Sequence, residues 1–112
     1  MKVAIIGSGF SSLSNACYLA KNGHEVEVFE KNDQLGGRAR IKIIEGFTFD
    51  MGPSWYWMPD VFDNFFADFG KKVSDFYDLR RIDPSYRVFW PDSPDDIPAS
   101  MDELIAYFEK YE

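Results

Sequence analysis

The chain has 112 residues, of which 46% are apolar and 28% charged, so disordered and collagen-like classes are excluded. Its net charge of −7 argues against a nucleic-acid partner, because phosphates would be repelled. The single cysteine excludes an internal disulfide and fits a reducing compartment, and the first apolar run, residues 3–6, is too short to span a membrane or to serve as a secretory signal.

The first thirty residues predict a strand-helix-strand unit. Residues 2–6 form a short apolar run that stops at Gly7, typical of a buried strand. Residues 25–30, with Val26, Val28 and Phe29 as their apolar members, predict a second strand. A helix is expected over 10–22, with one packing face on which the cysteine would be buried. That face carries Leu13, Ala16, Cys17 and Ala20. A helical crossover of this length implies parallel strands and a right-handed connection, so we expect an α/β, Rossmann-like βαβ unit.

A hairpin and a further helix are expected next. Two short strands, 40–44 and 47–50, flank Glu45-Gly46 and predict a β-hairpin. A helix should begin near Pro59 and end before Gly70, with an apolar stripe that favours a core position. The stripe consists of Phe62, Phe65, Phe66 and Phe69.

The last third of the chain predicts one strand, one turn and one helix. The strand is expected over 86–90 and the turn over 91–95, which is rich in proline and aspartate. Ser100 and Glu103 match a capping box. We expect the helix that they begin to be still running at the last residue, 112.

The composition changes near Gly52. Seven of the eight glycines lie at or before this position, and all six prolines follow it. The whole net charge also arises after it, together with fifteen of the twenty aromatic residues. We therefore expect a dinucleotide-binding region over 1–54 and the start of an α+β substrate region over 55–112. Trp55 and Trp57 would either line an apolar substrate tunnel or belong to the core.

The strongest motif is the glycine-rich loop between the first strand and the helix. Gly7 permits a tight turn, and a side chain at Gly9 would block a pyrophosphate from the backbone. Free N–H groups at the start of the helix, aided by its dipole, would receive the negative charge. Ser12 stands where the usual pattern has a third glycine, and its hydroxyl is able to donate to phosphate. The candidate cradle comprises Gly7, Ser8, Gly9, Phe10, Ser11 and Ser12.

Two further features follow the second strand. Glu30 lies 21 residues after Gly9, where a carboxylate accepts hydrogen bonds from ribose hydroxyls and repels the 2′-phosphate of NADP. Gly36 and Gly37 permit another close backbone approach, and the guanidinium of Arg38 suits phosphate. The alternatives are a surface glutamate and a flexible turn with a solvated arginine.

The sequence resembles FAD-dependent oxidoreductases of the phytoene desaturase family (carotenoid desaturases and isomerases), which belong to the amine-oxidase-like flavoproteins. Many FAD enzymes share the first three matching blocks, whereas the fourth narrows the likeness to the desaturase-like branch. The blocks are VAIIGSGF (3–10), VFEK (28–31), LGGRA (35–39), GFTFDMGPS (46–54) and DPSYRV (83–88). The likeness covers essentially the whole chain but only the N-terminal part of the family's longer enzyme, so we expect a fragment that is inactive alone.

The resemblance implies a cofactor, FAD, and a role for each matching position. Gly7, Ser8 and Gly9 would hold the pyrophosphate, and Glu30, with Lys31 beside it, would bind the ribose. Gly36, Gly37 and Arg38 would line the pyrophosphate and the ribityl portion. Gly52, Pro53 and Ser54 would approach the flavin end. It further implies hydride removal from an apolar polyene by a cytoplasmic enzyme peripheral to the inner face of a membrane. The flavin carries this chemistry itself, so no catalytic side chain is named, and no metal site is expected.

Three other interpretations stay open at this point. The chain is also compatible with a non-catalytic dinucleotide-binding module or with another amine-oxidase-like flavoprotein. An NAD-linked dehydrogenase is a third, although the blocks at 36–38 and 47–54 fit a longer, extended flavin better. The aromatic surface of the isolated fragment is expected to drive self-association.

Overall fold

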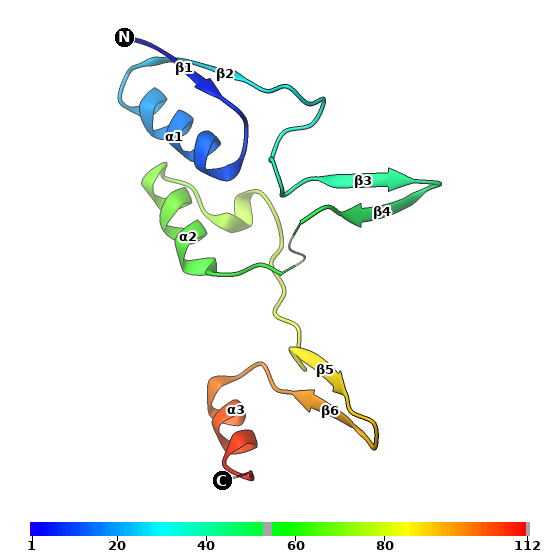
Figure 1. Cartoon of the computed structure of the whole chain (residues 1–112). Coiled ribbons are helices and arrows are strands. Elements are labelled where there is room, and N and C mark those ends of the chain that lie inside the picture. The colour runs from blue at the N-terminus through cyan, green and yellow to red at the C-terminus, as the bar shows by residue number, and fades with distance from the viewer. Residues whose placement is uncertain (53–54, 112) are drawn as a thin grey trace. The chain divides into compact units, whose positions relative to one another are not determined.

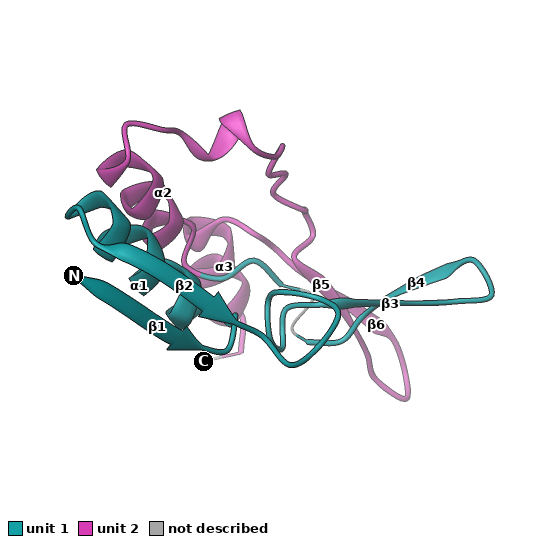
Figure 2. Ribbon diagram, turned by 90° about the horizontal axis from the view of Figure 1, so that it is seen from above, with its two compact units in different colours: residues 1–57 teal, residues 58–112 magenta. Residues whose placement is uncertain are grey.

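The computed structural model describes residues 1–52 and 55–111 (Figure 1). The chain divides into two compact units, residues 1–57 and 58–112, which Figure 2 distinguishes by colour. The candidate site belongs to the first unit. Each unit is therefore described by itself.

The first unit begins with a strand-helix-strand motif. Its elements are β1 (Lys2–Ile6), α1 (Phe10–Lys21) and β2 (Glu25–Phe29). The two strands are parallel and in register from Lys2 opposite Glu25 to Ile6 opposite Phe29, and α1 packs against both. The predicted α/β unit with a helical crossover is confirmed. The helix ends at a turn in which Gly23, with φ of 80°, adopts the left-handed conformation that favours glycine.

The predicted burial of Cys17 is wrong. Cys17 and Ala20 are exposed, whereas Leu13 and Ala16 are half-buried. In the part of the chain that the structure describes, the sheet that α1 covers consists of β1 and β2 alone, so it offers the helix a narrow surface. The part of the stripe that contains the cysteine therefore faces outward in the described chain.

The predicted hairpin after this motif is confirmed. Its strands are β3 (Ile41–Ile44) and β4 (Phe47–Asp50), antiparallel with Ile44 opposite Phe47. Glu45 and Gly46 both have positive φ, 51° and 84°, as a two-residue type I′ turn requires. Arg40, predicted to belong to the first of these strands, lies just before β3, and its carbonyl accepts a hydrogen bond from Met51.

Trp55 and Trp57 close the first unit. Their rings stack with centroids 6.2 Å apart and planes within 8° of parallel. The side chains are 70% and 65% exposed, so the expectation that they belong to the core is wrong for the described chain. Exposure of both rings is consistent with the other expectation, a tunnel wall, which stays a prediction.

The second unit begins with α2 (Pro59–Asp68) and a short 3₁₀ helix, η1 (Val73–Asp75). The four phenylalanines of the predicted stripe are all half-buried. Phe66 stacks on Phe76, just after η1, with ring centroids 4.7 Å apart. The small core of this unit includes Val73 and Ile97, the two buried apolar residues of the described chain. The apolar stripe of α2 therefore holds its helix against η1, as predicted from its spacing.

A second hairpin follows, formed by β5 (Tyr86–Phe89) and β6 (Pro94–Ile97). The turn predicted over 91–95 is too long, because Pro94 and Asp95 already belong to β6. Proline is tolerated as the first residue of a strand. Arg87 and Asp96 lie directly opposite each other and form a two-armed ion pair, with nitrogen-oxygen distances of 2.5 and 2.7 Å. The sequence predicted no strand over 94–97, and the cross-strand pair with Arg87 explains how so polar a segment becomes one.

The last helix is α3 (Met101–Phe108). Half of the predicted capping box is present: the amide of Glu103 donates to the Ser100 hydroxyl at 3.2 Å. The Glu103 carboxylate accepts from that same hydroxyl at 2.8 Å, whereas a full box has it accept from the N-cap amide. The prediction that the helix runs to residue 112 is wrong. The amide of Tyr111 bonds to the Phe108 carbonyl at 2.9 Å, a tighter i→i+3 bond that ends the α-helical pattern.

Candidate dinucleotide-binding site

The glycine-rich loop lies at the carboxyl end of β1, where a parallel sheet receives its ligands. Gly7 has φ of 93°, and its amide donates to the Phe29 carbonyl at 2.7 Å. This bond continues the β1–β2 ladder by one step beyond the last strand residue. The loop is therefore anchored to the sheet before it turns into α1.

Gly9 opens the helix and leaves room above the backbone. It is the N-cap of α1, with φ of −69° and ψ of 169°, and its carbonyl accepts from the Leu13 amide at 2.9 Å. A Cβ added at Gly9 would meet no atom of the described chain within 4 Å. The glycine N-cap makes no side-chain cap hydrogen bond, and the N-terminus of a helix attracts anions through its first amides and its dipole.

Glu30 lies beside this loop, as predicted. Its Oε2 accepts hydrogen bonds from the amide of Ser8 at 2.9 Å and from the Ser8 hydroxyl at 2.6 Å. Its Oε1 accepts from the amide of Asn32 at 3.0 Å and from the Asn32 carboxamide at 2.6 Å. Ser8 is only 1% exposed, so the loop buries the residue that fixes the carboxylate.

These bonds shift the titration of the carboxylate strongly. They lower the pKa of Glu30 from its ordinary 4.5 to about 2, mainly through the Ser8 hydroxyl and then through the Asn32 amide, while partial desolvation opposes the shift. The site therefore presents a negative charge throughout the physiological pH range. That charge suits ribose hydroxyls and disfavours a 2′-phosphate.

The second glycine pair packs against the first loop. The Gly36 amide donates to the Ser8 carbonyl at 2.9 Å, and Gly9 and Gly36 form a parallel bridge. A Cβ at Gly37, which has φ of 63°, would lie 3.1 Å from the Gly9 Cα. The absence of a side chain at Gly37 thus lets the second glycine pair approach Gly9 this closely.

Gly52 makes another close approach. A Cβ placed there would lie 2.3 Å from the carbonyl oxygen of Arg38, which no side chain could tolerate. Gly52 therefore lies against the end of the second loop. Pro53 and Ser54, predicted to approach the flavin end, lie outside the described residues.

The predicted site residues differ in how closely they converge. The structure brings together Gly7, Ser8, Gly9, Glu30, Gly36 and Gly37. Phe10 and Ser11 are exposed in the first turn of α1, and Ser12 is half-buried. Lys31 and Arg38 are exposed beside the cluster, each adjacent in sequence to one of its members. Their placement leaves both cations accessible to a ligand phosphate.

Sequence reasoning missed two side chains that shape this region. Asn32 donates two hydrogen bonds to Glu30. The sequence pattern that could have predicted this contact is an asparagine two residues after a candidate ligand-binding carboxylate, a spacing at which hydrogen bonds between side chains and nearby backbone recur. Gln34 accepts a hydrogen bond from the Ile41 amide at 3.0 Å through its Oε1. It ties the segment between Glu30 and the hairpin to the start of β3.

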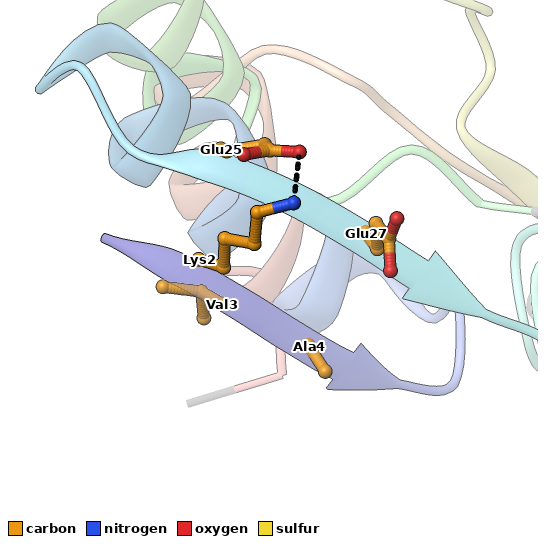
Figure 3. Close-up of a pocket in the computed structure, with 5 residues that line it drawn as sticks. All are labelled: Lys2, Val3, Ala4, Glu25 and Glu27. Atoms are coloured by element: carbon orange, nitrogen blue, oxygen red, sulfur yellow. Dashed lines mark ion pairs between the residues drawn. The ribbon is translucent and has the colours of Figure 1, made fainter.

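A shallow pocket on the β1–β2 ribbon is not a candidate for the dinucleotide. Figure 3 shows Lys2 from β1 reaching across to Glu25 on β2, an ion pair of 3.0 Å between two exposed side chains. Val3, Ala4 and Glu27 complete its lining. The two carboxylates would repel a diphosphate, and Lys2 and Glu25 begin their strands, at the opposite end from the glycine-rich loop.

Two other kinds of site are absent from the part of the chain that the structure describes. Its histidine, cysteine and acidic side chains form no group of three that could hold a metal ion. Its helices include none with the length and apolar character needed to cross a membrane. The glycine loops and Glu30 thus carry the functional interpretation.

A parallel βαβ unit with a glycine-rich turn, an open helix N-terminus and a carboxylate after the second strand defines a Rossmann-type dinucleotide-binding protein. The chain belongs to the family of NAD(P)-binding Rossmann-like domains, whose model matches residues 5–78.

Among curated proteins the chain is similar to carotenoid desaturases. It is 54% identical over 111 residues to the carotenoid 3,4-desaturase of Haloarcula japonica, covering 98% of this chain and 22% of that protein. It is 41% identical over 113 residues to the 4,4′-diapophytoene desaturase (4,4′-diaponeurosporene-forming) of Staphylococcus aureus strain Newman, covering 100% and 22%. The chain thus spans about a fifth of the length of these relatives. The predicted resemblance is confirmed: the chain corresponds to the dinucleotide-binding region of carotenoid and phytoene desaturase homologues.

A solved structure shares the fold. The crystal structure of the PF1083 protein from Pyrococcus furiosus superposes with a TM-score of 0.61 at 26% identity. The match covers 86% of this chain and 24% of that one. Here too the likeness concerns one region of a longer protein.

Proposed function

We propose that this chain is the FAD-binding portion of a flavin-dependent oxidoreductase that removes hydride from an apolar polyene. The names of its two relatives, a carotenoid 3,4-desaturase and a 4,4′-diapophytoene desaturase, support the reaction and the substrate class. A cytoplasmic location, peripheral to the inner face of a membrane, belongs to the same proposal, because such substrates dissolve in lipid.

The observation that carries the proposal is the convergence of Gly9, Glu30 and Gly36. Open space over Gly9 at the N-terminus of α1 suits a pyrophosphate, and the ionised Glu30 beside it suits an adenosine ribose. The second glycine pair bonded to the first loop supports FAD over NAD, because it adds backbone surface for a longer dinucleotide.

Each part of the chain then has a stated task. FAD, when bound, supplies the hydride acceptor. The amides after Gly7 orient the pyrophosphate, Glu30 accepts from the ribose, and Lys31 and Arg38 contribute positive charge near the phosphates. We carry the remaining positions over from the family resemblance: Phe10, Ser11 and Ser12 at the helix start, and Gly52, Pro53 and Ser54 toward the flavin.

The substitution Gly9→Ala in the full chain tests this assignment. Its backbone conformation is open to alanine and the space is free, so folding stability should change by less than about 1 kcal/mol. The added methyl group would keep a pyrophosphate from the backbone, and we expect the flavin absorption bands of the purified protein to be lost. Thermal unfolding checks the first expectation and the visible spectrum the second.

Gly46→Ala in the hairpin turn is the matched control. Gly46 has φ of 84°, so alanine there is strained, yet the turn is not among the proposed FAD contacts. This variant should lose some stability and keep its flavin. If Gly9→Ala retains flavin as the unsubstituted protein does, the loop is not the pyrophosphate site. A colourless protein that binds NAD in a titration would replace the flavoenzyme proposal with an NAD-linked one.

A further inference from the structure

The carboxylate of Glu30 is saturated with hydrogen bonds in the described chain. A carboxylate offers about four acceptor positions, two on each oxygen. Oε2 uses its two for the amide and hydroxyl of Ser8, and Oε1 uses its two for the amide and carboxamide of Asn32, all within 3.0 Å. A ribose hydroxyl that donates to Glu30 must therefore displace one of these donors.

The four donors differ in how easily they can leave. The two backbone amides are fixed by the chain, and Ser8 is buried at 1% exposure with its hydroxyl 2.6 Å from Oε2. The Asn32 side chain is exposed, so its carboxamide can rotate into water and exchange one hydrogen bond for another. Of the four, the Asn32 carboxamide is the group that a ligand displaces at least cost.

We propose that the Asn32 carboxamide occupies the acceptor position on Glu30 Oε1 that a ribose hydroxyl of the dinucleotide takes on binding. Asn32 is thereby a specificity-determining residue: its Nδ2 competes with the incoming hydroxyl, while Ser8 and the Asn32 amide keep the carboxylate in place. This inference rests on the proposed function, since it requires that Glu30 bind the ribose.

Competition by Asn32 predicts the direction in which removal of its side chain changes ADP affinity. Replacing Asn32 by alanine removes the side-chain donor and leaves the backbone amide, so Glu30 keeps three of its four bonds. Its free acceptor position is then occupied by water, which a hydroxyl displaces more readily than a tethered amide. We expect Asn32→Ala to bind ADP roughly three- to tenfold more tightly, the range that one exchanged hydrogen bond supports.

The experiment is calorimetric titration of the full chain, freed of bound nucleotide, with ADP and with 2′,3′-dideoxy-ADP. The gain from Asn32→Ala should appear with ADP and vanish with the dideoxy ligand, which has no ribose hydroxyl to donate. Asn22→Ala is the matched control, because Asn22 is another exposed asparagine whose Nδ2 donates at 2.8 Å, to the Tyr18 carbonyl at the end of α1. It should leave both affinities unchanged.

Glu30→Ala separates the two proposals. If it weakens ADP binding while Asn32→Ala leaves ADP binding unchanged, the ribose contact stands and the competition by Asn32 is wrong. If Asn32→Ala weakens both ligands alike, Asn32 supports the site instead of competing for it, which also overturns the inference. If Glu30→Ala does not alter ADP affinity, the ribose contact itself is misplaced and both proposals fall.

Discussion

Ser8 donates twice to the carboxylate of Glu30, a residue 22 positions later, through its hydroxyl at 2.6 Å and its amide at 2.9 Å. This pair joins the ends of β1 and β2 at the edge where parallel strands present their carboxyl ends. The proposed sugar acceptor and the proposed phosphate loop are therefore held relative to each other by the chain itself. Because these groups are already ordered, less conformational entropy is lost on binding.

Substituting Ser8 by alanine should raise the pKa of Glu30 from about 2 toward 4.5, because the Ser8 hydroxyl is the largest cause of the depression. The titration of the Glu30 carboxyl carbon, followed by NMR, measures it directly. Ser14→Ala, within α1, gives the same chemical change away from the carboxylate and should leave the titration unaltered. A Ser8→Ala protein whose Glu30 still titrates near 2 would show that the hydroxyl does not hold the charge.

Acid should release the same contacts, and the direction follows from the sign of the shift. The folded-state pKa of Glu30, about 2, lies below its ordinary 4.5. The contribution of the carboxylate to stability is therefore fully present above about 4.5 and is lost as the pH falls toward 2. Amide exchange at Ser8 and Asn32 should stay slow down to about 4.5 and quicken below it relative to the intrinsic rate.

Glu30→Gln is the control for this pH response. The neutral amide cannot titrate, so exchange at Ser8 and Asn32 should lose its dependence on the Glu30 carboxyl. An identical acid response in the variant would assign the loosening to other carboxylates.

The strand-helix-strand unit was predictable because its determinants are local. The apolar run before Gly7, the helical spacing after Gly9 and the 21-residue interval to Glu30 each lie within one motif. The exposure of Cys17 was not predictable in the same way, because it depends on how many strands the helix covers. Helical periodicity identifies a face but does not reveal the width of the sheet beneath it.

The same distinction applies to the candidate site. The glycines were predicted from what a phosphate requires of a backbone, whereas the contact of Gly37 with Gly9 and of Gly52 with Arg38 depends on how separate loops meet. The role of Asn32 was missed because asparagine in a loop has many local partners. The strand β6 was missed altogether, because its polar residues are stabilised as a strand by their partners on β5.

Gly52→Ala should be much more damaging than its chemistry suggests. Its Cβ would lie 2.3 Å from the Arg38 carbonyl oxygen. The backbone fixes the position of both atoms, so one of the two segments has to move. We expect a loss of about 1–3 kcal/mol in unfolding free energy, the range of overpacked sites, measured by chemical denaturation. Gly9→Ala, which meets no atom of the described chain within 4 Å, is the matched control. Equal stability of both variants would mean that residue 52 does not approach the second loop.

Phe66→Leu tests whether ring stacking holds α2 in the second unit. Phe66 stacks on Phe76 with centroids 4.7 Å apart and also meets Tyr77 edge-on at 6.4 Å, and leucine keeps an apolar side chain but loses both ring contacts. We expect a loss of about 1 kcal/mol by chemical denaturation, the usual contribution of an aromatic pair. Phe89→Leu, at a position 78% exposed in β5, should change stability by less than about 0.5 kcal/mol. If the two variants lose equally, the ring contacts of Phe66 contribute no more to stability than an exposed side chain does.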